Sequence, residues 1–184
     1  MKKIKDKKCK ECGATYTPFN SLQQVCSPKC ASILAEKKVW KKKKDELINK
    51  SKTRTEWLNL LQKVFNQWIR LRDEKKGCIT CLKPFKDKFD AGHFLAVGSY
   101  PNLRFNEDNV HGQCVHCNQH KHGASAEYFI QLPNRIGLDK FNELLNSRNE
   151  SLKLTLDEIQ ELIKIYKLKI KDYGKNNDTR TGEN

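Results

Sequence analysis

Two pairs of cysteines in the middle of the chain constrain its fold more than any other feature. Cys78 and Cys81 form one C-x2-C pair, and Cys114 and Cys117 form a second pair after 32 intervening residues. Two such pairs can fill the tetrahedral shell of one zinc ion. A shell of four thiolates leaves no position for water, so we expect this zinc to be structural. The alternative interpretation is four ordinary buried thiols.

The segment between the pairs is long enough to hold structure of its own. Lys88 to Phe94 is predicted to be a short strand and Asn109 to Gln113 a second one. The stretch after Cys117 has no proline until Pro133 and can start a helix. Strand, loop, strand and helix is the order of the ββα-metal module, the HNH or His-Me finger motif.

Residues of this segment match the needs of phosphodiester hydrolysis. An imidazole with a pKa of about 6.5 can activate water at neutral pH, and we assign that role to His93. Asn118 and His122 are four residues apart, so on a helix they would share one face and could bind Mg²⁺ or Mn²⁺. Asn109 precedes the second strand, and its amide could hold the loop that carries His93. The simpler alternatives are a surface or core histidine at 93 and a helix N-cap at Asn118.

A second cysteine set lies near the start of the chain. Cys9 and Cys12 are followed by Cys26 and Cys30, which predicts a small zinc knuckle or ribbon, with a disulfide pair as the alternative. The sequence shows no secretory apolar segment and no run of 18 apolar residues, so we expect a reducing cytoplasm and no membrane insertion.

The charge of the chain favours a nucleic-acid partner. Lys and Arg number 36 against 22 Asp and Glu, a net charge of +14, and the excess gathers before the central cysteines. Such a run is either a solvated helix face or a surface that contacts phosphates without reading base sequence. The predicted phosphate contacts are Lys41, Lys42, Lys43, Lys44, Arg54 and Arg104, with Arg70 and Arg72 as further candidates. His111, His116 and His120 are predicted to be exposed or to support the site from outside, and His111 is the best placed to touch phosphate or to orient the site.

Length and composition predict a small, mostly helical α+β protein. At 184 residues and 37% hydrophobic residues, the chain supports one modest core and small metal-stapled units. The last helix should start at the capping box Thr155 to Glu158, and its apolar stripe needs a partner in this chain or in another subunit. The predicted parts are a zinc knuckle (1–32), a basic linker or helix (33–54), an amphipathic helix (55–75), the zinc-stapled nuclease module (76–128), C-terminal helices broken at Pro133 (129–173) and a disordered tail (174–184).

The central motifs carry a family resemblance. The run Asp90-Ala91-Gly92-His93-Phe94, then Leu103-Arg104-Phe105, then Asn109 to Asn118, resembles the NinG/Rap recombination proteins of lambdoid phages. Phage endonuclease VII is similar more distantly, through two zinc-binding C-x2-C pairs with an asparagine after the last cysteine. The resemblance implies a phage-encoded or prophage-encoded, structure-specific endonuclease that acts on Holliday junctions and D-loops in the bacterial cytoplasm. Many HNH nucleases carry a metal-binding aspartate where this chain has Gly92, and Asp90, on the same strand face, is the predicted substitute.

These observations together predict an endonuclease that depends on Mg²⁺ or Mn²⁺ and acts on branched double-stranded DNA. Two zinc ions would be structural. Since a four-way junction needs two opposed cuts, we expect a homodimer, with recombination proteins as further partners. The alternatives are a non-catalytic module that binds branched DNA and a general HNH nuclease of the restriction or homing kind.

Overall fold

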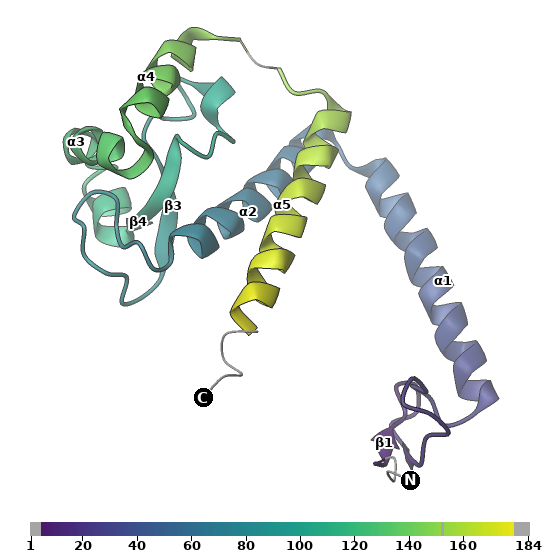
Figure 1. The fold of residues 1–184 in the computed structure, drawn as a ribbon. Coiled ribbons are helices and arrows are strands. Elements are labelled where there is room, and N and C mark those ends of the chain that lie inside the picture. Colours follow the sequence, from purple (N-terminus) through teal and green to yellow (C-terminus); the bar gives the residue numbers. More distant parts are fainter. Residues whose placement is uncertain (1–4, 152, 179–184) are drawn as a thin grey trace. The chain divides into compact units, whose positions relative to one another are not determined.

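The computed structural model describes residues 5–151 and 153–178 of the chain (Figure 1). The chain divides after Lys52 into two compact units, and each is described by itself. The fold is small, mixed α+β and mostly helical, as the sequence predicts. Its β structure consists of two short antiparallel pairs of strands within the described residues.

The first unit joins a short strand pair to one long helix. β1 (Lys7–Lys8) pairs antiparallel with β2 (Thr15–Tyr16), and α1 (Pro28–Ser51) follows. The helix starts at Ser27, whose hydroxyl accepts a hydrogen bond from the Cys30 amide, and the proline at its first position suits that start. α1 therefore begins inside the range predicted for the knuckle and extends through the basic segment. None of its side chains is buried within this unit.

Two long helices, α2 (Arg54–Asp73) and α5 (Leu156–Asp178), lie side by side in the second unit (Figure 1). The predicted capping box of α5 is present, because Thr155 and Glu158 exchange hydrogen bonds. The apolar stripe of α5 finds its partner within the chain, on α2. The buried side chains of this core are Trp57, Leu61, Val64, Phe65, Ile69, Val110, Ile159, Ile163 and Tyr166.

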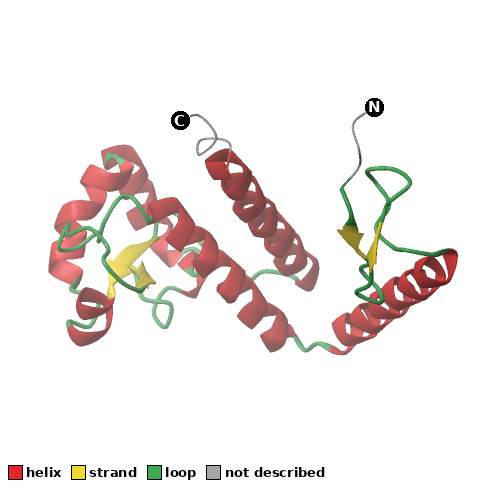
Figure 2. Cartoon of the chain, turned by 90° about the horizontal axis from the view of Figure 1, so that it is seen from below, coloured by secondary structure: helices red, strands yellow, loops and turns green. Residues whose placement is uncertain are grey.

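A strand hairpin packs against α2. β3 (Phe89–His93) and β4 (Val110–Cys114) pair antiparallel, close to the ranges predicted for them (Figure 2). Val110 on one face of the hairpin belongs to the core that α2 and α5 share. On the other face the hydroxyl of Tyr128 donates a hydrogen bond of 3.1 Å to the Gly92 carbonyl. The hairpin is thus held between two helical layers.

The helix predicted directly after Cys117 is a short π-helix, and no α-helix starts there. This element, η2 (His116–His120), is five residues long, and α3 (Ser125–Ile136) starts only after a turn. His122 lies in that turn with a φ of 51°, a left-handed conformation that cannot continue a right-handed helix. The expectation that Asn118 and His122 share one helical face is therefore wrong.

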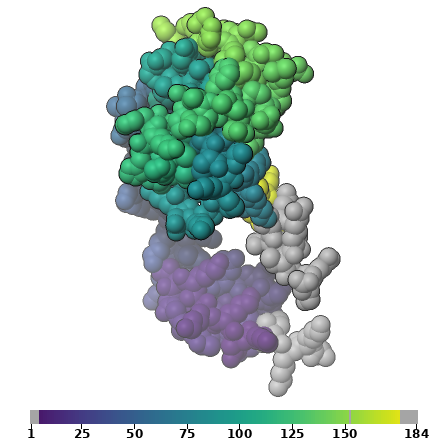
Figure 3. All heavy atoms as spheres, turned by 90° about the vertical axis from the view of Figure 1, so that its left-hand side faces the viewer, coloured from purple at the N-terminus to yellow at the C-terminus, as the bar shows by residue number. Residues whose placement is uncertain are grey.

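The predicted helix break at Pro133 is also wrong. α3 continues through Pro133 and ends at Gly137, where φ is 90°, before α4 (Leu138–Asn146). A proline removes one helical hydrogen bond, here to the carbonyl of Phe129, and that residue is 50% exposed, so water can replace the lost donor. Figure 3 shows the green segment with α3 and α4 packed against the teal segment of the hairpin. The buried side chains of this second core are Ile79, Leu103, Tyr128, Leu132, Phe141 and Leu144.

The C-terminal helix is longer than expected. α5 runs through Gly174 to Asp178, so the first part of the tail predicted to be disordered is helical, and residues 179–184 lie outside the described residues. Two 3₁₀ turns, η1 (Pro101–Leu103) and η3 (Ser147–Asn149), are also present. Of the helices described, none has both the length and the apolar character that a membrane span requires.

Candidate functional site

Four cysteines meet at the end of the hairpin that lies away from its connecting loop. The Sγ atoms of Cys78, Cys81, Cys114 and Cys117 all lie within 4.8 Å of one another, and those of Cys81 and Cys114 are 3.9 Å apart. A tetrahedral zinc ion with Zn–S bonds of about 2.3 Å sets its sulfurs about 3.8 Å apart. A disulfide would need about 2.05 Å. The predicted grouping is confirmed, and its spacing fits a zinc ion.

Hydrogen bonds favour the thiolate form of one member of this set, Cys78, while burial raises the pKa values of Cys81 and Cys117. The amide of Cys114 donates to the Cys78 sulfur at 3.4 Å, and the Thr80 hydroxyl lies 3.1 Å from the same sulfur. Burial alone would raise the pKa of Cys78, but the hydrogen bond of Thr80 and the nearby amides lower it to about 6. A thiol with this pKa is largely a thiolate at neutral pH, which is the form that binds zinc.

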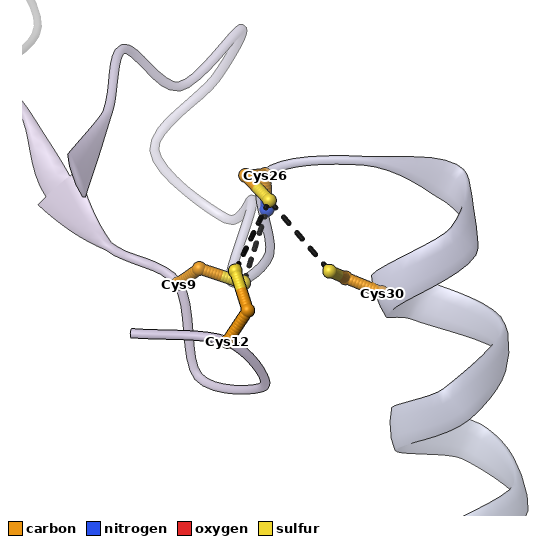
Figure 4. A group of neighbouring side chains, drawn as sticks. All are labelled: Cys9, Cys12, Cys26 and Cys30. Atoms are coloured by element: carbon orange, nitrogen blue, oxygen red, sulfur yellow. Dashed lines mark hydrogen bonds between the residues drawn. The ribbon is translucent and has the colours of Figure 1, made fainter. Parts of the chain in front are cut away.

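The cysteines of the first unit form an equivalent set (Figure 4). The Cys26 sulfur lies 3.6 Å from that of Cys12 and 3.7 Å from that of Cys30, distances that again suit tetrahedral zinc and exclude a disulfide. The Cys26 amide donates to the Cys9 sulfur at 3.4 Å. Amide hydrogen bonding, first from Cys12, lowers the pKa of Cys9 to about 6. Both sets could therefore hold a zinc ion.

His93 ends β3 at the loop end of the hairpin, and its ring has a defined tautomer. Its Nε2 lies 2.9 Å from the carbonyl oxygen of Arg104. A carbonyl only accepts hydrogen bonds, so Nε2 carries the proton and Nδ1 keeps a lone pair. Burial lowers the pKa of His93 below its ordinary value, because a half-buried imidazolium loses hydration. His93 is therefore a neutral imidazole at neutral pH, with Nδ1 able to accept a proton.

The buried amide of Asn109 ties together the loop that follows His93. Its Oδ1 accepts a hydrogen bond of 2.8 Å from the Leu95 amide, and its Nδ2 donates to the carbonyls of Leu95 and Leu103, each at 3.1 Å. The Asn109 carbonyl also accepts from the Phe94 amide at 2.9 Å. The residues just after His93 are thus fixed to the start of β4.

Asp90 and Asn118 come together on the opposite face of β3 from His93, as the alternation of strand side chains requires. The Asp90 carboxylate accepts hydrogen bonds from Asn118 Nδ2 at 3.0 Å and from Gln119 Nε2 at 2.8 Å. A half-turn of the Asn118 amide would present its oxygen, and a carboxylate with an amide oxygen is a donor set that suits hydrated Mg²⁺. His122 is exposed and makes no hydrogen bond to either residue within the described part of the chain.

Gln113 is a site residue that the sequence predictions do not include. Its side chain is fully buried and donates to the Thr80 hydroxyl at 3.2 Å and to the Gly123 carbonyl at 2.7 Å. Its Oε1 is buried without a partner among the described residues, and a β-carbon on Gly92 would lie 2.2 Å from it. Gln113 therefore occupies the space that a side chain at position 92 would need. The one sequence signal is a polar residue directly before the ligand Cys114.

Arg72 and His111 bond inside the fold, so His111 is not the exposed residue that was one of its two predicted roles. The Arg72 guanidinium donates to both oxygens of Asp73 and to Nδ1 of His111 at 3.0 Å. It also donates to the carbonyls of Glu107 and Val110. Burial would raise the pKa of Asp73, but the bonds to Arg72 keep it well below its usual range. Burial lowers the pKa of His111, which is only 3% exposed. The N–H groups of Arg72 and His111 thus bond to other residues of this chain.

The remaining basic candidates lie at the surface or close to His93. Lys41, Lys42, Lys43 and Lys44 are all exposed on α1. The Arg54 guanidinium donates to the Leu154 carbonyl at 2.8 Å, and Arg104 donates to the Gln62 amide oxygen at 2.7 Å. His116 and His120 are exposed, as predicted.

Known relatives cover nearly the whole chain. The pattern of the family described as "Bacteriophage Lambda NinG protein" matches residues 1–176. "Protein ninG" of Escherichia phage lambda is 35% identical over 195 residues, which cover 94% of this chain and 95% of that protein. "Protein ninG" of Salmonella phage P22 is 34% identical over 195 residues, 94% of this chain and 96% of the relative. No solved structure matches the chain. By both the family pattern and these relatives, the chain belongs to the NinG family of bacteriophage lambda.

Proposed function

We propose that this protein is a metal-dependent endonuclease that cuts branched double-stranded DNA. The observation that carries the proposal is the state of His93. A neutral imidazole, oriented through Nε2 by the Arg104 carbonyl, ends a strand in a hairpin framed by four cysteines. A general base needs this protonation state and a fixed direction. Asn109, through its bonds to the following loop, serves as the positioning residue.

In the proposed reaction, His93 Nδ1 takes a proton from a water molecule as the water oxygen forms a bond to phosphorus. The bond from phosphorus to the departing sugar oxygen breaks, and that oxygen leaves with the electron pair. A divalent cation, Mg²⁺ or Mn²⁺, held by Asp90 and Asn118 would supply positive charge for the phosphate and the departing oxygen. Because Asp90 and His93 leave opposite faces of β3, we expect the phosphate to lie at the edge of β3 that does not pair with β4.

The choice of branched DNA rests on the family and on charge. A net charge of +14 favours contacts to phosphates, which read the shape of DNA more than its base sequence. The resemblance to NinG/Rap proteins implies Holliday junctions and D-loops as substrates. We expect the protein to act in the cytoplasm of the infected bacterium, beside other recombination proteins.

The proposal includes a homodimer, since two opposed cuts resolve a four-way junction symmetrically. Light scattering of the free and the junction-bound protein tests this part. A dimer mass in the presence of the junction is expected. A monomer mass in both states would remove the dimer and leave the nuclease proposal standing.

Cleavage of labelled DNA tests the function itself. A four-way junction, a linear duplex and a single strand of matched sequence are incubated with Mg²⁺ and the wild-type protein, the His93→Ala variant or the His120→Ala variant. We expect the wild type to cut near the branch point. His93→Ala should cut at a rate at least about 100-fold lower, because it lacks the general base. His120 is exposed, so His120→Ala should cut like the wild type.

Other outcomes decide between the alternatives. Tight junction binding without any cut, with Mg²⁺ or Mn²⁺, would make the protein a non-catalytic module for branched DNA. Equal cutting of the linear duplex would make it a general HNH nuclease. Cutting by His93→Ala at the wild-type rate would remove His93 as the base.

A further inference from the structure

A cavity of about 460 Å³ is lined in part by Arg104, the residue whose carbonyl holds the His93 ring. It lies wholly within the second unit, between the start of α2, the segment from residue 97 to 106 and the start of α5. Arg104 connects it to the candidate base, because the Arg104 carbonyl accepts the hydrogen bond of His93 and Arg104 is one of the residues that line the cavity. Its volume falls in the range of roughly 300 to 1,000 Å³ that encloses small organic ligands.

The inner lining of the cavity is apolar and aromatic. Leu58 of α2, Phe105 and Leu162 of α5 line it, and all three are partly buried hydrophobic residues packed on the larger core. The Arg104 guanidinium lies 5.2 Å from the centre of the Phe105 ring. An aromatic ring and a guanidinium plane are the two surfaces on which a nucleobase stacks.

The mouth of the cavity carries positive charge. Arg54, Arg104 and Lys153 contribute cationic side chains, and none of the described residues that line the cavity is acidic. Asn106 adds an amide whose Oδ1 accepts from the Asp108 and Asn109 amides, which leaves its Nδ2 as a donor without a partner among the described residues. An apolar interior, an amide donor and a cationic mouth match a flat base joined to an anionic backbone.

We propose that this cavity receives one unpaired nucleobase of the branched DNA. The inference rests on the proposed function and names the feature of the substrate that the protein recognises. Taking a base out of a continuous duplex costs stacking and pairing energy, and the cost is least where pairing is already interrupted, as at a branch point. The cavity thus selects branched over linear DNA without reading sequence, and it places the neighbouring phosphates beside His93.

A binding cycle tests the proposal without any cleavage. Affinity is measured by fluorescence anisotropy in buffer without Mg²⁺ or Mn²⁺, and the DNA is checked afterwards on a denaturing gel. Four-way junctions carry either a normal base or an abasic site at each nucleotide next to the branch in turn. The protein is the full chain, as wild type, Val97→Trp or Leu138→Trp. Val97 lines the cavity, whereas Leu138 is an exposed residue of α4 outside it and gives the matched control.

We expect one abasic position to weaken wild-type binding about tenfold, the size of one lost stacking interaction. Val97→Trp should weaken binding of the intact junction by the same factor and be insensitive to the abasic site, because the cavity is already filled. Leu138→Trp should behave like the wild type. Lys153→Trp covers the mouth from an exposed position and provides a second variant if Val97→Trp does not fold.

Either of two results overturns the inference. The first is that no abasic position weakens binding of the wild type. The second is that the losses of affinity from the variant and from the abasic site add. The cleavage assay is separate, so the two proposals fail separately. If the protein cuts junctions but the variant and the abasic site act independently, the base-binding inference is wrong and the nuclease proposal stands. If the two effects are not additive but no DNA is cut, the nuclease proposal is wrong and the base-binding inference stands.

Discussion

The side-chain oxygen of Gln113 lies 2.2 Å from the position that a β-carbon on Gly92 would take. The Gln113 side chain on one strand thus leaves no room for a side chain at position 92 on the neighbouring strand. Thr80 and Gly123 anchor the Gln113 amide nitrogen, so the amide cannot swing aside without losing buried hydrogen bonds.

This contact predicts that Gly92→Ala is destabilising by about 1 to 3 kcal/mol, the cost of overpacking a closed site. Gly98→Ala is the matched control, because a β-carbon there meets nothing within 4 Å. Thermal unfolding of both variants measures the difference. In a Gln113→Ala background the penalty of Gly92→Ala should largely vanish. Equal melting temperatures for Gly92→Ala and Gly98→Ala would contradict the contact.

The lowered pKa of His93 predicts how cleavage depends on pH. Nδ1 stays unprotonated at neutral pH, and the rate falls only as the pH drops through a pKa below the ordinary value of about 6.5. Single-turnover rates between pH 5 and pH 8, a range of about three units around that value, give the profile. Stability should fall in the same direction, because the unfolded chain binds the proton more readily. A rate that keeps rising above pH 7.5 or so would point to another base.

Substitution of one cysteine in each set tests the two candidate zinc sites independently. Cys114→Ser should lose the zinc of the hairpin and unfold it, since metal binding and folding are coupled in such small sites. Cys12→Ser is the matched change in the other unit and should leave the hairpin folded. Metal analysis should give two zinc ions per chain for the wild type and one for each variant. Limited proteolysis shows which unit has opened.

The pairing of Asp90 with Asn118 predicts where the catalytic cation binds. Asp90→Asn should raise the Mg²⁺ concentration for half-maximal cleavage at least about tenfold, because it removes the one negative ligand. Asp87→Asn is the control, since Asp87 is exposed just before β3. A Mg²⁺ titration of junction cleavage compares them. An unchanged requirement in Asp90→Asn would place the cation elsewhere.

The parts of the fold that follow from short-range chemistry could be predicted from the sequence. The spacing of the cysteines predicted both groups of four. The capping box at Thr155 and the apolar stripe that follows it predicted α5. The turn after η2 was not predictable, because His122 and Ala124 adopt left-handed conformations that residues other than glycine rarely adopt. The helix break predicted at Pro133 was wrong because the carbonyl that the proline leaves without a hydrogen-bond donor belongs to Phe129, a half-exposed residue. Gln113 was missed because only the packing of two strands shows what fills the space over Gly92.

Cys117 and Asn118 are consecutive residues of one π-turn, yet one belongs to the zinc set and the other to the Asp90 pair. A displacement of that turn moves both. Thermodynamic linkage then requires reciprocity: if bound zinc raises the affinity of the Asp90 and Asn118 pair for Mg²⁺ by some factor, bound Mg²⁺ raises the affinity for zinc by the same factor. With such coupling, a chelator would need a higher concentration to remove zinc from the chain in the presence of Mg²⁺ than in its absence.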